Sequence, residues 1–590
     1  MSVAVLWTAE DARRLLLDAP KVSSAIGLTP VSRIKELDTF VKVINNQDNF
    51  NNIKQAYLIE KVETVREKLI KQFENCPEFS PGVREIVLDH YNRVAFSSLR
   101  LWESLGEVGP WIIRIDSDWK TFNTRKAAFH ALIDQGLVNK IDSEKSAAKL
   151  REPFFISFFC WLQRITLGKI LCKKTNVLSN ALKEKSGLLP AISETSPELT
   201  IVIAQPSRSL LKPYAILFRD IARSFMCKSP IQYTLTPQFS SPQNDFVKKI
   251  ISAVEDPVIK PAFDCYQDLM VYRIMILQAL ESEANNLCRN IPFKAFIAAE
   301  LSNVLGWLLS QATKDASIPR IVLSRNAHAP AVDKLGLMAV RDYFRARYPK
   351  NMVDTYLMWS PLGLAAAKQV LPETEHSAIK NVRVLSNQVK KNYKKNLNRD
   401  RFILFADSFV TWWYPHNWIY QNSDEFIQCL IDFCDAIKQV DKVEALVRVK
   451  HKHECDLPAI NQLVNPPKNV KINIRDGSFA KDVERADLVI SFRSTTIEES
   501  IHARTPVLLW GASMRHPYLD VQNIKPNISK RSAIYMSNRK ENLAEMISSI
   551  LDAHAGRPLI DEEIEPYVFS EDIRDLNYLA HSISGGRGII

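Results

Sequence analysis

The sequence is poor in the features that mark disordered, disulfide-stapled or membrane-spanning chains. Glycine is scarce, with 16 in 590 residues, and 46% of the residues are hydrophobic, so most of the chain is expected to fold. The nine cysteines include no CxxC pair and are odd in number, which argues against a disulfide framework and a zinc ribbon. The apolar runs are interrupted or shorter than the roughly 20 residues that cross a bilayer. Met1–Trp7 lacks the basic start of a secretory signal, so we expect a cytoplasmic protein.

The chain is too long for one hydrophobic core, because single cores stop growing at about 250–300 residues. We expect an N-terminal lobe at 1–385, a C-terminal lobe at 386–565 and a C-terminal helix or tail at 566–590. The boundary lies near the basic cluster 390–399, which reads as a solvated linker or as a contact with a membrane or acceptor. The net charge of +11 indicates an anionic partner: a nucleotide-linked substrate, nucleic acid or the inner leaflet.

Short β-rich runs alternate with helix-length stretches over the whole chain, which predicts an α/β fold with parallel sheets covered by helices. The helices expected in the N-terminal lobe include 55–73, 246–255, 269–289 and 331–347. The strands expected there are 3–7, 111–115, 200–204, 320–324 and 355–359. Those expected in the C-terminal lobe are 401–406, 445–449, 470–474, 487–491 and 506–510, with helices at 423–440, 481–485 and 496–503.

In such folds ligands lie at the carboxyl ends of the strands, so the residues that follow each strand are the site candidates. These are Asp116, Asp118, Gln205, Ser207, Arg325 to His328, Asp407, Lys450 to His453, and Ser491 to Thr496.

The strongest pattern is the segment 486–500, in which a buried strand runs into a hydroxyl-rich turn that opens a helix. The free amides and positive dipole of the helix start favour an anion, and hydroxyls at Ser494, Thr495 and Thr496 can add hydrogen bonds to a phosphate. Glu498 or Glu499 can accept from ribose hydroxyls one turn later. The alternative is simple capping, because Thr495 with Glu498 and Thr496 with Glu499 both fit a capping box.

This segment resembles the donor-binding motif of GT-B glycosyltransferases, especially those that build bacterial capsule and surface polysaccharides. The matching residues are Ser494, Thr495, Thr496, Glu499 and the pair Pro506-Val507. Arg504 stands where that motif usually has glycine, so the end of the helix must be capped differently. The resemblance implies two Rossmann-like lobes whose parallel sheets face a central cleft, with the nucleotide held by the C-terminal lobe at Ser491–Glu499.

Two further segments resemble the same enzymes. Lys450, His451, Lys452 and His453 stand where transferases of CMP-activated acidic sugars carry a Lys-Pro-His-Pro-like motif, although both prolines are missing. The resemblance implies that Lys450 and His451 neutralise the donor phosphates and that His453 protonates the leaving group; an exposed polar loop and a zinc site at His451 and His453 are the alternatives.

The second of these segments is 324–330, followed by the strand that ends at Trp359. His328 would act on the acceptor or on the donor phosphates, or be an ordinary surface residue. Asp116 and Asp118 are candidates for the catalytic base, with helix capping as the alternative, and Gln205 and Arg325 for binding the acceptor. Aromatic residues at 412–416 can stack a ring or pack in a core.

Together these features predict a glycosyltransferase that moves a sugar from a nucleotide donor to a bacterial surface glycan or a lipid-linked glycan. The donor is expected to be a CMP-linked acidic sugar, such as Kdo or a sialic-acid relative, or a UDP-sugar. No cofactor and no metal are expected, because Asp116-Ser117-Asp118 lies too early for a metal-binding pair. A peripheral contact with the inner face of the membrane fits the charge. The alternatives are a nucleotide-sugar 2-epimerase and a basic nucleic-acid-binding or scaffold protein.

Overall fold

The computed structural model describes two sets of residues. The first consists of the strands at 3–6, 24–27, 42–45, 111–115, 138–143, 177–180 and 201–203. The second consists, with short gaps, of the stretches 52–105, 242–298, 301–381, 400–407, 423–449, 456–474, 479–511 and 519–568. All strand pairs within them are parallel, as the sequence predicts.

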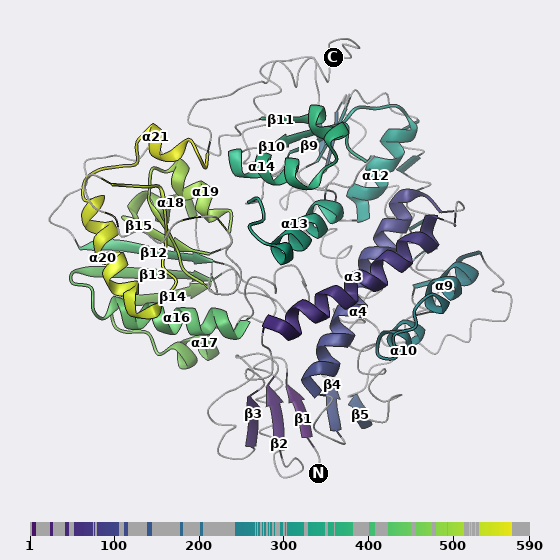
Figure 1. The fold of residues 1–590 in the computed structure, drawn as a ribbon, viewed down its shortest axis with the longest axis horizontal. Helices are drawn as coiled ribbons and strands as arrows, with labels where there is room; N and C mark the ends of the chain where they lie inside the picture. The colour runs from purple at the N-terminus through teal and green to yellow at the C-terminus, as the bar shows by residue number, and fades with distance from the viewer. Residues whose placement is uncertain are drawn as a thin grey trace.

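The first strands of the chain form sheets of their own. β1 (Val3–Leu6), β2 (Ser24–Gly27) and β3 (Lys42–Asn45) pair side by side, and β4 (Trp111–Ile115) pairs with β5 (Val138–Ser143). β1 also lies next to β4 at the base of Figure 1. The strands expected at 3–7 and 111–115 are therefore present, but they do not join the sheet that contains the strands at 320 and 355.

Two long helices separate these strands from the rest of the N-terminal lobe. α3 (Asn52–Glu74) and α4 (Pro81–Leu105) cross the middle of the molecule in Figure 1. Val62, Val65 and Leu69 of α3 are buried at three- and four-residue spacing, which is the pattern of a helix that packs one face on a core. The same core holds α9 (Pro242–Ser252), α10 (Ile259–Cys265) and α12 (Val304–Asp315).

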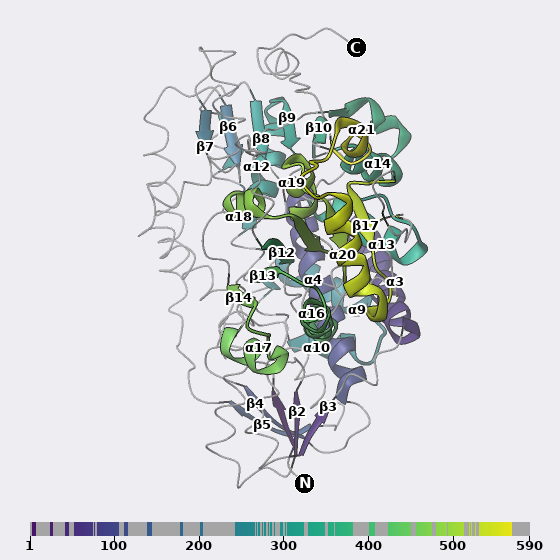
Figure 2. The same cartoon turned by 90° about the vertical axis from the view of Figure 1, so that its left-hand side faces the viewer.

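The second sheet of the N-terminal lobe has six strands in the order β11-β10-β9-β8-β6-β7 (Figure 2). Counted along the chain, β6 is the first of these strands, and the order reverses between β6 and β8, as in flavodoxin-like folds. Its strands are β6 (Val177–Asn180), β7 (Ile201–Ile203), β8 (Ala295–Ala298), β9 (Arg320–Leu323), β10 (Thr355–Met358) and β11 (Ile379–Asn381). The helices beside it are α13 (Lys334–Arg347), α14 (Pro361–Val370) and the 3-10 helix η5 (Glu373–Ala378).

The C-terminal lobe contains a six-stranded sheet in the order β14-β13-β12-β15-β16-β17. Counted from β12 this is the order 3-2-1-4-5-6 of the Rossmann fold, with its reversal between β12 and β15. Its strands are β12 (Arg401–Asp407), β13 (Val443–Val449), β14 (Val470–Ile474), β15 (Leu488–Ser491), β16 (Val507–Leu509) and β17 (Ile534–Met536).

Both faces of this sheet are covered, which explains the unbroken apolar run of β12. Ile403 and Phe405 face one layer, whereas Phe402, Leu404 and Ala406 face the other, because side chains alternate along a strand. The first face carries α16 (Ser423–Ile437), α17 (Leu457–Val464) and α20 (Leu543–Ala553), which follows the 3-10 helix η6 (Lys540–Asn542). The second carries α18 (Phe479–Arg485), α19 (Thr496–His502) and α21 (Asp561–Ile564).

The apolar layer on the second face also contains residues of the N-terminal lobe, so we call it the shared layer. Its members include Ile59, Ala329, Ala339, Leu404, Val489, Ile497, Ile501 and Leu509. Since α3 and α13 contribute to it together with α19, the two lobes are packed against each other around α19.

The expected fold class, α/β with two Rossmann-like lobes, is confirmed, with the small N-terminal strands as an addition. Residues 382–399, at the expected domain boundary, and most of the predicted tail at 566–590 lie outside the described residues. Over the described residues, no helix has the length and apolar character that a membrane span needs.

Candidate functional site

The predicted nucleotide segment lies where the strand order of the C-terminal sheet reverses. β12 and β15 are hydrogen-bonded neighbours, with Phe405 opposite Ile490, and they end at Asp407 and Ser491. In doubly wound sheets the chain leaves these two strands toward opposite faces, which opens a crevice at their carboxyl ends and makes it the preferred place for a ligand. The topology therefore puts the turn 491–496 at the position where a Rossmann-type site is expected.

Hydrogen bonds fasten this turn to the neighbouring strand. The hydroxyl of Thr496 donates to the carbonyl oxygen of Ala406 at 2.9 Å. Its oxygen also lies 3.1 Å from the hydroxyl of Ser491, which is fully buried. Because the single proton of Thr496 is directed at Ala406, Ser491 is the donor in the second bond. Thr496 and Ser491 therefore hold the turn in place.

The first turn of α19 is capped by Ser494 and not by Thr495. The hydroxyl of Ser494 accepts from the amide of Thr496 at 3.3 Å, and its carbonyl accepts from the amide of Ile497 at 3.1 Å. Thr495 occupies the N-cap position but makes no side-chain capping bond, so the capping box of Thr495 with Glu498 is not formed. Thr495 is half-buried, and because its hydroxyl makes no capping bond, that hydroxyl is available to another partner.

The two glutamates of α19 differ in their surroundings. Glu498 is only 1% exposed, and its Oε1 accepts from the hydroxyl of Ser360 in the N-terminal lobe. Glu499 is half-buried on the same helix. Of the two candidate ribose acceptors, Glu499 is therefore the one with access to solvent.

Close packing of the Gly511 backbone against the side chain of Phe492 supports the turn. Phe492, which is 1% exposed, follows β15, and Gly511 comes two residues after the end of β16. A Cβ atom at Gly511 would lie 2.3 Å from Cγ and 2.7 Å from Cβ of Phe492. Only glycine allows this approach. Gly511 was not among the expected site residues, although a glycine soon after a buried strand, in a chain with so few glycines, is a detectable signal.

The end of α19 has the conformation that glycine would take, although the residue is arginine. Arg504 has φ 58°, and its amide bonds the carbonyl of Ile501 at 2.9 Å. Its guanidinium donates to the carbonyl oxygen of Leu559 at 3.2 Å and pairs with Asp561. The side chain thus ties the end of α19 to α21. The backbone cap itself is the one that glycine would form, because the amides of Arg504 and Thr505 bond the carbonyls of Ile501 and Ser500, so the different capping expected at this position is not found.

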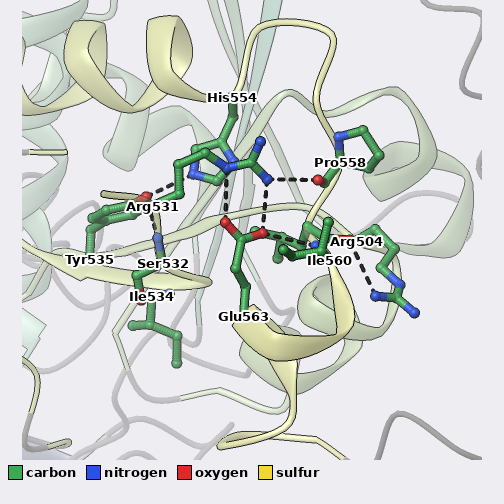
Figure 3. A network of polar contacts seen from close by, with 10 residues as sticks. Arg504, Arg531, Ser532, Ile534, Tyr535, His554, Pro558, Ile560 and Glu563 are labelled. Carbon is green, nitrogen blue, oxygen red and sulfur yellow. Dashed lines mark hydrogen bonds and ion pairs between the residues drawn. The ribbon is translucent and has the colours of Figure 1, made fainter. Parts of the chain in front are cut away.

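A polar network lies beyond α21 (Figure 3). Arg531 makes two hydrogen bonds of 2.8 Å to the carboxylate of Glu563, and these side chains are only 12% and 10% exposed. Beside them, the phenol of Tyr535 accepts from the amide of Ser532 and lies 2.7 Å from Nε2 of His554. These contacts involve the strand β17, the C-cap residue of α20 and the helix α21.

The other predicted site residues lie outside the described residues, so they stay predictions. These are Asp116, Asp118, Gln205, Arg325, His328, Lys450, His451 and His453. The strands that precede these residues are among the described elements. β13 ends at Val449 opposite Asp407, so the chain enters the basic segment beside the switch point. β7 and β9 lie in one sheet, whereas β4, which precedes Asp116, lies in another.

The described residues include no group of three or more His, Cys, Asp or Glu side chains that could hold a metal ion.

Two Rossmann-like sheets in one chain, the second with a hydroxyl-rich turn at its switch point, form the two-lobed α/β arrangement of the GT-B fold. No protein-family model and no curated protein matches the sequence.

Similar solved structures, each with 70% of this chain covered, include three bacterial proteins. A glycosyltransferase from Rickettsia africae is 11% identical over 100% of its chain, with a TM-score of 0.39. A UDP-GlcNAc 2-epimerase from Neisseria meningitidis bound to UDP-GlcNAc is 10% identical over 98% of its chain, with a TM-score of 0.38. Acinetobacter baumannii MurG is 11% identical over 99% of its chain, with a TM-score of 0.34. With scores this low, the fold class rests on the sheet orders of this chain itself.

Proposed function

We propose that this chain is a glycosyltransferase that uses a nucleotide-linked sugar as donor. The observation that carries the proposal is the turn 491–496 at the switch point of a Rossmann-like sheet, held against β12 by the bond from Thr496 to Ala406. A preorganised turn with an uncommitted hydroxyl at the positive end of a helix suits a phosphate, because the site does not have to be assembled when the anion arrives.

Within this proposal the donor phosphates bind at Thr495 and the first turn of α19, and Glu499 accepts from the ribose. Lys450 and His451 neutralise the phosphates, and His453 protonates the leaving group. Asp116 or Asp118 acts as the base, His328 acts on the acceptor or the phosphates, and Gln205 and Arg325 bind the acceptor. The net charge of +11 favours anionic substrates in general.

The donor is a CMP-linked acidic sugar or a UDP-sugar, and the acceptor is a bacterial surface glycan or a lipid-linked glycan. The first option follows from the resemblance of the basic segment 450–453 and of the hydroxyl-rich turn, and the missing prolines of the basic segment keep the second option open. Transfer proceeds at the cytoplasmic side without a divalent metal. Turnover that survives exhaustive chelation supports metal independence, and turnover that is lost and then restored by magnesium or manganese refutes it.

A thermal-shift screen against CMP-, UDP-, GDP- and CDP-linked ligands tests the proposal. A ligand at 100 times its Kd stabilises the native state by about 2.7 kcal/mol, so the correct nucleotide class raises the Tm and the others do not. No shift with any nucleotide contradicts the proposal. Ser494→Ala and Thr495→Ala should each reduce the shift if the turn holds the phosphate.

Incubating the stabilising sugar nucleotide without acceptor then distinguishes transfer from epimerisation. An unchanged sugar configuration supports a transferase, whereas conversion to the 2-epimer without acceptor identifies an epimerase. Tight polyanion binding that falls steeply with salt, together with no nucleotide affinity, identifies a nucleic-acid-binding protein instead.

A further inference from the structure

Ser360 and Glu498 form a hydrogen bond between the two lobes. Ser360 follows β10 and is the N-cap of α14, where its oxygen accepts from the amide of Gly363 at 3.0 Å. Since that bond uses a lone pair, the hydroxyl proton is available to Glu498, whose Oε1 lies 2.5 Å away. The capping geometry therefore directs the donor of Ser360 at the carboxylate.

The bond lies inside an apolar interface. Ser360 and Glu498 are each 1% exposed. Ile497 and Ile501, on either side of Glu498 along α19, belong to the shared layer, and Leu362 of α14 packs against it. Apolar contacts tolerate small displacements, but removing a hydrogen-bond donor from a buried carboxylate is costly. The hydrogen bond therefore defines one position of α14 relative to α19.

That position matters for the candidate site, because Glu498 lies one helical turn after Thr495 on the same helix. A displacement of α19 moves the amides of its first turn and the half-buried Thr495 with it. The same bond fastens α19 to the carboxyl end of β10, in the lobe predicted to bind the acceptor.

We propose that Ser360 is a positioning residue that acts through Glu498 to hold α19, and that it thereby couples nucleotide binding to the placement of the two lobes. The coupling rests on the proposed function, whereas the positioning of α19 does not. Glu498 is accordingly a structural partner of Ser360, and contact with the ribose falls to Glu499.

Three variants test the proposal. Ser360→Asp keeps an oxygen that can cap α14 but replaces the hydroxyl donor by a second carboxylate facing Glu498. Adding Glu498→Gln to it restores a donor-acceptor pair with reversed polarity, because the Gln amide can donate to the new carboxylate. Ser80→Ala is the matched control: Ser80 also precedes a proline and caps a helix, bonding the amide of Val83 at 3.2 Å, but it lies at the start of α4.

Hydrogen exchange of the peptides that contain α14 and α19 measures the positioning directly, without any nucleotide. We expect faster exchange in both peptides for Ser360→Asp, exchange close to wild type for the double variant, and no change there for Ser80→Ala. Unchanged exchange in Ser360→Asp would overturn the proposal, as would equal acceleration in the double variant.

Calorimetric titration with the nucleotide that stabilises the wild type measures the coupling. We expect Ser360→Asp to raise the Kd by about tenfold, within the 5–150-fold range usual for coupled sites, and the double variant to recover most of the affinity. Equal Kd values in wild type and Ser360→Asp would overturn the coupling. If the wild type binds no nucleotide, the proposed function and the coupling fail together, and the exchange measurement still decides whether Ser360 holds α19.

Discussion

The hydroxyl of Thr496 donates to the carbonyl oxygen of Ala406, so the turn after β15 is bonded to the strand β12 across 90 residues of sequence. Its neighbour Thr495 makes no capping bond. Two adjacent threonines in one turn therefore have different roles, one in fixing the turn and one in meeting a ligand.

This difference predicts opposite effects of the same substitution. Thr496→Val keeps the shape of the side chain but leaves the Ala406 carbonyl and the Ser491 hydroxyl without this partner, so we expect a loss of about 1–3 kcal/mol in stability. Thr495→Val should leave the Tm within about 1 °C of wild type, since the half-buried Thr495 makes no capping bond that valine would lose, and it should weaken nucleotide binding. Denaturation and titration of both variants check this. Equal losses of stability in the two would contradict the division of roles.

Gly511 is expected to be intolerant of any side chain. In Gly511→Ala the new Cβ overlaps Cγ and Cβ of Phe492. Because Phe492 is buried and belongs to the turn 491–496, it can move only by displacing the turn. Overpacking of this kind costs about 1–3 kcal/mol, and nucleotide affinity should fall with it. Gly82→Ala is the control, because its closest contact would be an ordinary 3.4 Å to the Trp307 carbonyl oxygen. A Gly511→Ala variant as stable as Gly82→Ala would show that Phe492 is not held as described.

Arg504 combines a left-handed backbone with a stabilising side chain, and two substitutions separate these effects. Arg504→Ala and Arg504→Gly both lose the bonds to Leu559 and Asp561. Only alanine keeps the penalty of φ 58°, so it should be less stable than the glycine variant by about 1 kcal/mol. Denaturant midpoints of the two variants measure the difference. Indistinguishable midpoints would mean that the backbone at this position is not strained.

Stability should fall at alkaline pH because of buried groups that resist ionisation. Burial raises the pKa of Tyr535 from 10.0 to about 12, and that of the Cys288 and Cys434 thiols from 9.0 to about 12. In the unfolded chain these groups lose their protons at the lower values, so stability is unaffected below pH 9 and decreases as the pH rises toward 12.

Tyr535→Phe is the variant that checks this pH dependence. It removes the phenol that bonds Ser532 and His554, so it should be less stable at neutral pH. Between pH 10 and 12, however, its stability should decline less steeply than that of the wild type. Denaturation midpoints across this range supply the measurement, and parallel declines would rule out a contribution from Tyr535.

The C-terminal lobe was largely predictable because its signals are local. The run Phe402–Ala406 is apolar at every position, as a strand covered on both faces must be, and Arg504 stands out by taking the place of glycine in a recognisable motif. The sequence predicted which segment forms the site but not which side chain has which role. It does not distinguish Thr495 from Thr496, because only the bond from Thr496 to the carbonyl of Ala406 separates their roles.

The remaining features depend on partners far away in the sequence. The local sequence indicates a helix cap at Ser360 and an acidic residue in the first turn of a helix at Glu498. Both indications are correct, but neither shows that the two side chains meet. The separation of β1–β5 from the β6–β11 sheet has the same origin, because any parallel strand offers the same pairing groups and its own sequence does not show which strand it will meet.

The shared layer has a consequence for dividing the protein. Ile59 and Ala339 on one side and Ile497 and Ile501 on the other are buried by each other's lobe, so a fragment ending at residue 385 or starting at residue 386 would present bare hydrophobic surface to water. Each half produced alone should tend to aggregate, whereas the two halves co-expressed in one cell should associate through the shared layer. The peptide connection between them is then less important for their association than the surface along which they meet.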